Sequence, residues 1–239
     1  MIEITFLEKW YWFLGIAVLG YLIGSLNFAF IISKLLKKDI TKMGSGNPGT
    51  MNMVREFGPV IGFTTFFLDA FKGGLPALGM YFLFRNYYFV GTDFCVGRLA
   101  EAICGLFAVL GHVLPITLNF KGGKGIATGL GLFWLTLGGH DPWLFLWGAI
   151  VLITEPFVLG VVKRSSLCSL CYLTGFGIWQ MIILRTSYVS GGIGLAASLL
   201  FVFVTVVVAW VAHAKNLKNL FAGEEHETTL FKKKKKKDC

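Results

Sequence analysis

The feature that most constrains the fold is a succession of long apolar stretches that carry almost no charge. Residues 10–33 contain no charged side chain and are long enough to cross a hydrocarbon core of about 30 Å. Further apolar windows cover residues 58–84, 94–111, 126–138, 143–162, 167–184 and 193–212. The sequence predicts an all-α integral membrane protein of about seven transmembrane helices, with five or six as alternatives because window 126–138 is short.

The composition supports a membrane protein and argues against a separate soluble domain. Of the 239 residues, 55% are hydrophobic and 15% are charged, which is far from the balance of soluble domains. Glu3 and Glu8 stand where a signal peptide carries basic residues, so we expect the first window to stay as a membrane anchor. We predict one polytopic domain over residues 1–226 and a basic, disordered tail over residues 227–239.

The five cysteines lie mostly in or beside apolar windows, where free thiols pack as small hydrophobic groups. Cys168 and Cys171 have C-x-x-C spacing, but no second pair and no nearby histidine completes a metal site. We therefore predict neither a disulfide framework nor a bound metal.

The basic residues sort onto one face of the membrane if the chain spans it seven times. We place the N-terminus outside and the C-terminus in the cytoplasm, because the positive-inside rule then holds. The cytoplasmic basic residues are Lys34, Lys37, Lys38, Lys42, Arg55, Lys121, Lys124, Lys163, Arg164, Lys215, Lys218 and Lys232 to Lys237. Those outside are Lys9, Arg85, Arg98 and Arg185. The net charge of +9 thus describes one face, directed at anionic lipid or anionic substrates rather than at nucleic acid.

A glycine- and lysine-rich loop interrupts the apolar pattern in residues 112–128, HVLPITLNFKGGKGIAT. Glycines let backbone N–H groups approach a ligand closely. Lys121 and Lys124 supply the positive charge that a phosphate group requires. This pattern predicts an anion site at the membrane surface.

A second polar loop, residues 44–52, reads GSGNPGTMN and has Arg55 one turn further on. It matches G-x-G-x-x-G, but no strand precedes it, so a dinucleotide-binding site is excluded. Its glycines, Ser45, two asparagines and Arg55 form a flexible, donor-rich loop suited to phosphate. An ordinary turn between helices is the alternative.

Two further polar segments lie on the same side in the seven-span topology. Residues 163–169, KRSSLCS, form a basic turn in which Ser165 or Ser166 is expected to cap the next helix. In residues 213–226, HAKNLKNLFAGEEH, His213 and Asn216 recur at helical spacing. Four polar segments on one side favour a shared site over four unrelated turns.

Two pairs of opposite charges lie in or near the apolar windows, where unpaired charges are unfavourable. Asp69 and Lys72 lie three residues apart, and a structural ion pair explains them about as well as a substrate-lining role. Arg98 and Glu101, near the outer end of the third window, are interpreted as a surface pair.

Five blocks of residues carry a family resemblance: GSGNPGTMN with Arg55, LDAFKG, GHVLPITLNFKGGKGIATGLG, SSLCS and HAKNLKNLFAGEEH. From about Tyr21 to His226 they resemble the bacterial glycerol-3-phosphate acyltransferases that use acyl phosphate, the PlsY family. The resemblance implies a multi-pass enzyme of the bacterial inner membrane, with its active site on the cytoplasmic face and no cofactor. It implies transfer of a fatty acyl group from acyl phosphate to the 1-hydroxyl of sn-glycerol 3-phosphate, which gives lysophosphatidic acid and phosphate in phospholipid biosynthesis. Membrane lipid and an upstream enzyme that forms acyl phosphate are the expected partners.

The resemblance also implies roles for individual residues. Those carried over to hold glycerol 3-phosphate are Ser45, Arg55, Lys121, Ser166, His213 and Asn216. Those carried over to hold acyl phosphate are Gly44, Gly46, Asn47, Gly49, Asn52, Gly122, Gly123 and Lys124. The candidate catalytic residues are His112, Ser45 and Lys121. The base is left open between a side chain and the donor phosphate, because positioning an activated donor supplies much of the rate.

A membrane transporter or channel for phosphate or another small anion is the alternative function, since basic glycine-rich loops would serve it too. Against it, the polar segments cluster on one side rather than at the midplane, and no internal repeat is visible. The sequence also lacks the H-x-x-x-x-D spacing of soluble-type acyltransferases and a G-x-S-x-G nucleophile elbow.

Overall fold

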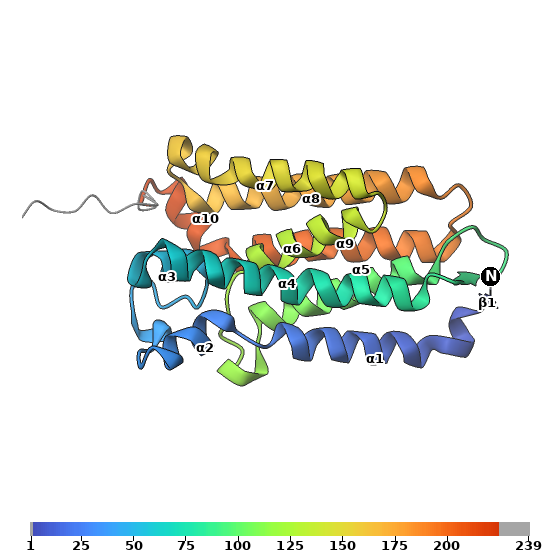
Figure 1. The fold of residues 1–239 in the computed structure, drawn as a ribbon, viewed down its shortest axis with the longest axis horizontal. Coiled ribbons are helices and arrows are strands. Elements are labelled where there is room, and N and C mark those ends of the chain that lie inside the picture. Colours follow the sequence, from blue (N-terminus) through green and yellow to red (C-terminus); the bar gives the residue numbers. More distant parts are fainter. Residues whose placement is uncertain (1, 225–239) are drawn as a thin grey trace, which may run out of the picture.

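The chain forms a bundle of long helices that run back and forth along one axis (Figure 1). The computed structural model describes residues 2–224, so the predicted domain end at 226 and the tail 227–239 lie outside the described residues. The helices that traverse the bundle are α1 (Phe6–Gly24), α4 (Pro59–Phe84), α5 (Val96–Val113), α6 (Ile126–Gly138), α7 (Pro142–Val162), α8 (Ser165–Ser187) and α9 (Gly192–Ala212). The shorter elements are α2 (Phe28–Leu35), α3 (Thr50–Phe57), α10 (Ala214–Phe221) and the 3-10 turns η1 (Ile40–Lys42) and η2 (Ile116–Leu118).

Within the described residues, five helical segments are long and apolar enough to cross a membrane. They are Phe6–Leu35, Val96–Leu118, Pro142–Val162, Ser165–Ser187 and Gly192–Ala212. Helix α4 is not among them and carries a buried Asp69 and Lys72, which lower its mean hydropathy. Helix α6 is apolar but has only 13 residues. The predicted count of seven depends on α4 and α6 and stays a prediction.

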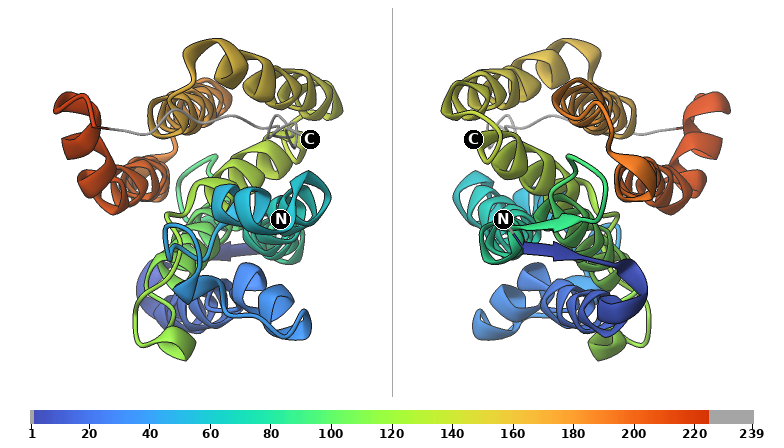
Figure 2. Two further views of the ribbon diagram at one scale, coloured as in Figure 1. Left: turned by 90° about the vertical axis from the view of Figure 1, so that its left-hand side faces the viewer. Right: turned by 90° about the vertical axis from the view of Figure 1, so that its right-hand side faces the viewer.

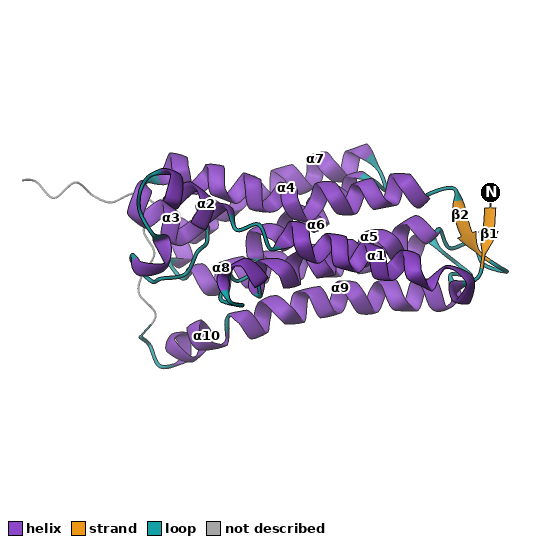
Figure 3. Cartoon of the chain, turned by 90° about the horizontal axis from the view of Figure 1, so that it is seen from below, coloured by secondary structure: helices purple, strands orange, loops and turns teal. Residues whose placement is uncertain are grey.

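The two ends of the bundle differ in character (Figures 1 and 3). One end carries α2, α3, α10 and the polar segments 36–58, 114–125, 163–164 and 213–224, and is called the basic end here. The first described residues and the short strands lie at the opposite end, called the strand end. Viewed from the basic end, α2, α3 and α10 are spread around the bundle (Figure 2, left). All four polar segments of the sequence therefore gather at one end.

Close helix packing fixes the centre of the bundle. Helix α5 is buried along most of its length and packs against α1, α4 and α9. A Cβ atom at Gly24 of α1 would collide with the backbone of Ala108, and one at Gly131 of α6 would collide with the backbone of Ala70. Small residues at such contacts let helix backbones approach closely, which is how membrane helices gain van der Waals contact.

The first apolar window is not one continuous helix. The structure divides it between α1 and α2, and the side chain of Asn27 caps α2 by accepting a hydrogen bond from the Phe30 backbone N–H at 2.8 Å. The Asn27 amide also donates to the carbonyl oxygen of Pro48 at 3.1 Å. Because a buried polar side chain in a membrane protein needs hydrogen-bond partners, the hydrogen bond from Asn27 to Pro48 stabilises the break between α1 and α2.

The predicted all-α fold is confirmed, and one short pair of strands accompanies the helices. Strands β1 (Ile2–Ile4) and β2 (Tyr87–Phe89) form a parallel pair at the strand end, with Ile2 opposite Tyr87. Each strand has three residues, too few for an alternating pattern to be recognisable in the sequence.

Candidate active site

The GSGNPG loop, residues 44–49, is shaped by the side chain of Asn52 in the first turn of α3. Its Oδ1 accepts a hydrogen bond from the Ser45 backbone N–H at 3.1 Å. Its Nδ2 donates to the carbonyl oxygens of Met43 at 3.0 Å and Ile40 at 3.4 Å. Asn52 is buried, so this amide organises the loop from within.

The same loop needs glycine where its backbone turns. Gly44 and Gly46 have φ values of 54° and 71°, a region that side chains with a Cβ rarely adopt. A Cβ at Gly44 would also collide with Asn52 Oδ1. Ser45 lies exposed between these glycines, and its Oγ accepts a 3.4 Å hydrogen bond from the Asn47 backbone N–H. The loop thus presents a serine hydroxyl on a tightly turned backbone.

The FKGGKG loop, residues 120–125, folds back onto the end of α5. The Gly122 backbone N–H donates to the Val113 carbonyl and the Gly123 N–H donates to the His112 carbonyl, both at 3.1 Å. Lys121 is exposed and Lys124 is half-buried. The backbone N–H groups of Gly122 and Gly123 are therefore engaged within the protein, while both lysines lie at the basic end.

A buried cluster, the inner triad of Asp69, Lys72 and His112, lies beneath the FKGGKG loop. Lys72 Nζ forms an ion pair with Asp69 Oδ1 at 2.7 Å and lies 2.9 Å from His112 Nδ1. It also donates to the carbonyl oxygen of Leu26 at 2.6 Å, in the break between α1 and α2. The LDAFKG block of α4 is therefore bonded both to the break and to the histidine that precedes the loop.

The third and fourth polar segments contact each other. The Asn216 side-chain amide of α10 donates to Ser166 Oγ of α8 at 2.8 Å. The expected serine cap of α8 was wrong, because Arg164 occupies the N-cap position and the helix begins at Ser165. Ser166 and Asn216, both expected to bind glycerol 3-phosphate, therefore form a direct contact between two helices.

His213 lies at the junction of α9 and α10 and is buried. Its Nδ1 lies 2.8 Å from the carbonyl oxygen of Ala209, which requires Nδ1 to carry the proton. Burial, with a smaller contribution from the positive charge of Lys124, lowers the pKa of His213 to about 4. His213 is therefore neutral at neutral pH and lies near a lysine of the FKGGKG loop.

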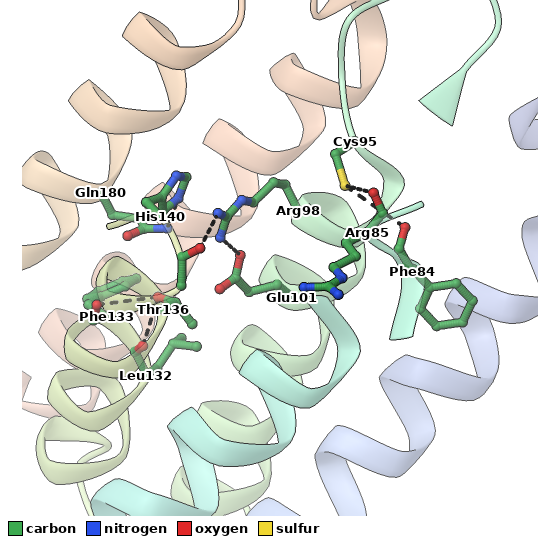
Figure 4. Close-up of polar contacts among 11 residues, drawn as sticks. Phe84, Arg85, Cys95, Arg98, Glu101, Leu132, Phe133, Thr136, His140 and Gln180 are labelled. Carbon is green, nitrogen blue, oxygen red and sulfur yellow. Dashed lines mark hydrogen bonds and ion pairs between the residues drawn. The ribbon is translucent and has the colours of Figure 1, made fainter. Parts of the chain in front are cut away.

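The second buried ion pair corrects an expectation. Arg98 and Glu101, called the outer pair here, are each 3% exposed, so they do not form a surface pair. Arg98 Nη1 lies 2.9 Å from Glu101 Oε2, and Nη2 donates to the Gly139 carbonyl oxygen at 2.9 Å (Figure 4). The guanidinium also lies 3.8 Å from the ring centroid of Tyr81, a favourable cation–π contact.

The outer pair lines a small cavity near the strand end, together with Thr136 and Gln180. The cavity measures about 10 Å³, which is about the space of a single water molecule. Burial lowers the pKa of the neighbouring His140 to about 3, with a contribution from the Arg98 charge. A space of this size accepts neither a phosphate ester nor an acyl group.

Sequence reasoning missed the groups that hold the polar loops in place. The break between α1 and α2 supplies three of them: the Leu26 carbonyl bound by Lys72, the Asn27 amide bound to Pro48, and the Ser25 carbonyl bound by Thr117 at 2.9 Å. The available signal was the pair Ser25 and Asn27 in an otherwise apolar window. Ser45 and Arg55 lie at the same end as these groups.

Fold and site together define a helical integral membrane protein that gathers basic, serine and asparagine side chains at one end of its bundle. A family model described as glycerol-3-phosphate acyltransferase matches residues 14–223. The chain belongs to the glycerol-3-phosphate acyltransferase family, as its motifs predicted.

Named relatives match along most of their length. A glycerol-3-phosphate acyltransferase of Thermotoga petrophila is 33% identical, with 90% of this chain and 96% of the relative covered. One from Staphylococcus haemolyticus is 36% identical, with 87% and 94% covered. The fold is similar to the crystal structure of PlsY (YgiH), an integral membrane glycerol 3-phosphate acyltransferase, in its glycerol 3-phosphate form. That likeness has a TM-score of 0.69 and 29% identity, and covers 91% of this chain and 96% of the other.

Proposed function

We propose that this protein transfers a fatty acyl group from acyl phosphate to the 1-hydroxyl of sn-glycerol 3-phosphate. The observation that carries the proposal is the family match over residues 14–223. The match includes all four polar segments of the basic end, apart from residue 224. A solved relative, PlsY, was captured in a glycerol 3-phosphate form and in a lysophosphatidic acid form. Family membership favours acyl transfer over anion transport.

The proposed glycerol 3-phosphate site combines cations with neutral hydrogen-bonding groups. Arg55 and Lys121 would bind the phosphate oxygens, because guanidinium and ammonium groups form charge-assisted hydrogen bonds with phosphate. Ser45, Ser166, His213 and Asn216 would orient the glycerol moiety. The Asn216 to Ser166 hydrogen bond supports this set, since it joins two of these residues from different helices.

The proposed acyl phosphate site consists of the GSGNPG loop and the end of the FKGGKG loop. Lys124 would neutralise the donor phosphate, and Gly44, Gly46, Asn47 and Gly49 would let it approach the backbone. Asn52 would act by holding the loop, which its three hydrogen bonds support. Gly122 and Gly123 would keep the second loop close to α5.

In the proposed reaction, the 1-hydroxyl oxygen of glycerol 3-phosphate attacks the carbonyl carbon of acyl phosphate. The new C–O bond forms, the bond between the carbonyl carbon and the phosphate oxygen breaks, and the hydroxyl proton leaves with the departing phosphate. The products are lysophosphatidic acid and inorganic phosphate. The main contributions of Lys121, Lys124 and Arg55 would be positioning of two anions and neutralisation of their charge.

The proposed setting is the bacterial inner membrane, with seven spans, the N-terminus outside and the active site on the cytoplasmic face. The concentration of basic residues in the segments of the basic end supports this orientation. An upstream enzyme that forms acyl phosphate would supply the donor, and no cofactor is required because the donor is already activated.

The test is product formation by the purified protein in detergent. Labelled glycerol 3-phosphate would be given with palmitoyl phosphate or with palmitoyl-CoA, beside Arg55→Ala and the exposed strand-end variant Arg185→Ala. We expect lysophosphatidic acid from palmitoyl phosphate alone, lost in Arg55→Ala and retained in Arg185→Ala. Absence of product from both donors, with phosphate moving across reconstituted vesicles, would overturn the proposal in favour of a transporter.

A further inference from the structure

The inner triad places two charges and a histidine inside the bundle next to the candidate site. Asp69, Lys72 and His112 are 0%, 6% and 3% exposed, and ionisable groups at such positions in membrane proteins usually have a functional role. We propose that Lys72 and Asp69 are positioning residues that hold His112 in the tautomer with its proton on Nε2, so that His112 donates a hydrogen bond to phosphate bound at the FKGGKG loop. The identity of that ligand rests on the proposed function, whereas the tautomer does not.

The first step is the orientation of Lys72. Its Nζ lies 2.7 Å from Asp69 Oδ1, and this carboxylate stabilises the ammonium form. The Leu26 carbonyl oxygen accepts a second contact at 2.6 Å. Two fixed partners on different elements leave the ammonium little freedom to rotate, so its remaining N–H direction is determined by the fold.

The second step concerns the proton on His112. Lys72 Nζ lies 2.9 Å from His112 Nδ1. An ammonium group has three donors and no acceptor, so Nδ1 must accept this hydrogen bond with its lone pair. Asp69 Oδ1 is 3.7 Å from the same nitrogen, too far to compete as a hydrogen-bond acceptor. A neutral imidazole with a bare Nδ1 carries its proton on Nε2.

The third step is the direction of Nε2. The nearest atom to the position that a Cβ would occupy on Gly123 is His112 Nε2. Glycine is therefore needed at 123 because the tip of the imidazole ring fills the place of a side chain. The Nε2–H group lies against the inside of the loop that also carries Lys121 and Lys124.

The consequence for the reaction is a division of roles. An Nε2–H donor stabilises a phosphate oxygen or the negative charge that develops on the attacked carbonyl oxygen, and preorganised donors of this kind lower the barrier. An imidazole with Nε2 protonated does not accept the proton of the attacking hydroxyl at that atom. His112 is accordingly assigned as a donor, and the departing phosphate carries the proton away.

Nitrogen NMR of the full chain measures the His112 tautomer in the unaltered protein, and a variant serves only to assign the signals. The protein would be labelled with ¹⁵N-histidine and placed in lipid nanodiscs, and the signals of His112 would be assigned by their loss in His112→Asn. We expect a protonated Nε2 and an unprotonated Nδ1 at neutral pH. A proton on Nδ1, or on both nitrogens, would overturn the inference whatever the outcome of the acyl transfer assay.

Addition of glycerol 3-phosphate or inorganic phosphate to the same sample tests the donor role, with glycerol as the uncharged control. We expect the His112 Nε2 signal to shift with either phosphate compound and not with glycerol. An unchanged signal in a protein that forms lysophosphatidic acid would overturn the donor role while leaving the proposed function intact. An unchanged signal in an inactive protein would count against both.

A matched pair of variants at Lys72 separates positioning from packing. Lys72→Gln keeps an N–H donor for His112 Nδ1, whereas Lys72→Met has a similar length and no donor. We expect Lys72→Met to mix the two tautomers and lower kcat by about tenfold or more, with a smaller change in KM, and Lys72→Gln to retain most of both properties. Equal loss in the two variants, with the tautomer unchanged in Lys72→Met, would contradict the positioning role.

Discussion

The inner triad and the outer pair are built on the same local motif and do different things. Both contain opposite charges three residues apart on one helix, Asp69 with Lys72 and Arg98 with Glu101, and both are buried. Lys72 also reaches a histidine and a carbonyl of a neighbouring segment. The guanidinium group of Arg98 donates a hydrogen bond to the Gly139 carbonyl oxygen and stacks on the ring of Tyr81.

The difference lies in the third partner of each pair. The inner pair contacts the imidazole of His112 next to the FKGGKG loop, so its charge acts on the group that we propose as the hydrogen-bond donor to phosphate. The outer pair contacts a carbonyl oxygen (Figure 4) and a small cavity, so its charges interact with groups inside the bundle. An i, i+3 ion pair in a membrane helix therefore has no fixed role, and its surroundings determine it.

The largest expected effect comes from removing the carboxylate of the inner triad. Asp69→Ala leaves the buried ammonium of Lys72 without a counter-charge, and breaking a buried pair in this way typically lowers the free energy of unfolding by about 3–5 kcal/mol. We also expect acyl transfer to be lost. Circular dichroism of thermal unfolding in detergent and the product assay measure the two effects. The double variant Asp69→Ala/Lys72→Met should regain stability and stay impaired in catalysis.

The equivalent change in the outer pair should affect stability alone. Glu101→Ala leaves the Arg98 charge buried, and we expect the free energy of unfolding to fall by about 3 kcal/mol. Because the pair contacts no residue of the basic end, kcat per folded molecule should equal that of the unaltered protein. A kcat that falls together with stability would show that the two pairs are not functionally separate.

A smaller effect is expected from a substitution that loosens the GSGNPG loop, which lies at the same end of the bundle as the inner triad. Asn52→Ala removes the hydrogen bonds to Ser45, Met43 and Ile40, and we expect a loss of about 1–3 kcal/mol with a rise in the KM for acyl phosphate. Asn52→Asp keeps the acceptor for Ser45 but places a buried carboxylate oxygen against the carbonyl oxygens of Met43 and Ile40. Because an unpaired buried charge is unfavourable, substrate titration at fixed enzyme concentration should show at least as large an effect as in Asn52→Ala.

The smallest expected effects are changes in the pH dependence of stability, from Asp39 at the basic end and Asp93 at the strand end. The Thr41 hydroxyl, followed by Lys34, lowers the pKa of Asp39 to about 2, and the backbone N–H groups of Val189 and Ser190 lower that of Asp93. A lowered pKa contributes stability that is complete above the ordinary carboxyl pKa and disappears as the pH falls through the folded-state value. Melting temperatures should therefore drop less between about pH 4 and pH 2 in Asp39→Asn and Asp93→Asn than in the unaltered protein.

Salt sharpens this last comparison. Asp39 pairs with Lys34 at 2.9 Å, whereas Asp93 is bound by backbone N–H groups. Added salt screens exposed ion pairs over about 10 Å at 0.1 M, so it should reduce the contribution of Asp39 more than that of Asp93. Equal salt dependence in the two variants would contradict this account.

Much of the helix layout was predictable, because long apolar windows have few alternatives in a membrane. Window 126–138 coincides with α6, and windows 58–84, 143–162 and 193–212 each differ from α4, α7 and α9 by one residue at the start. The break between α1 and α2 was not predictable. The Asn27 amide donates to the Pro48 carbonyl oxygen, and the Ser25 carbonyl oxygen accepts from the Thr117 hydroxyl; no local pattern reveals these contacts.

The motifs predicted which residues form the candidate site, and that set stays a prediction, whereas the contacts among those residues could not be predicted. The family resemblance identified Ser166 and Asn216, but their direct hydrogen bond depends on the packing of α10 against α8. The surface interpretation of Arg98 and Glu101 was wrong because spacing does not reveal burial by Tyr81 and Gly139. The link from Lys72 to His112 joins residues 40 apart in sequence, and only the packing of α4 on α5 brings them together.

The hydrogen bond between Ser166 and Asn216 joins parts of the chain that are synthesised at different times. The two residues are 50 positions apart, and Asn216 lies in the last helix of the described chain. A nascent chain that has already inserted α8 still lacks this partner and His213. With the site proposed above, acyl transfer would require nearly the whole polypeptide, so unfinished chains would release no lysophospholipid, a detergent-like product, into the membrane.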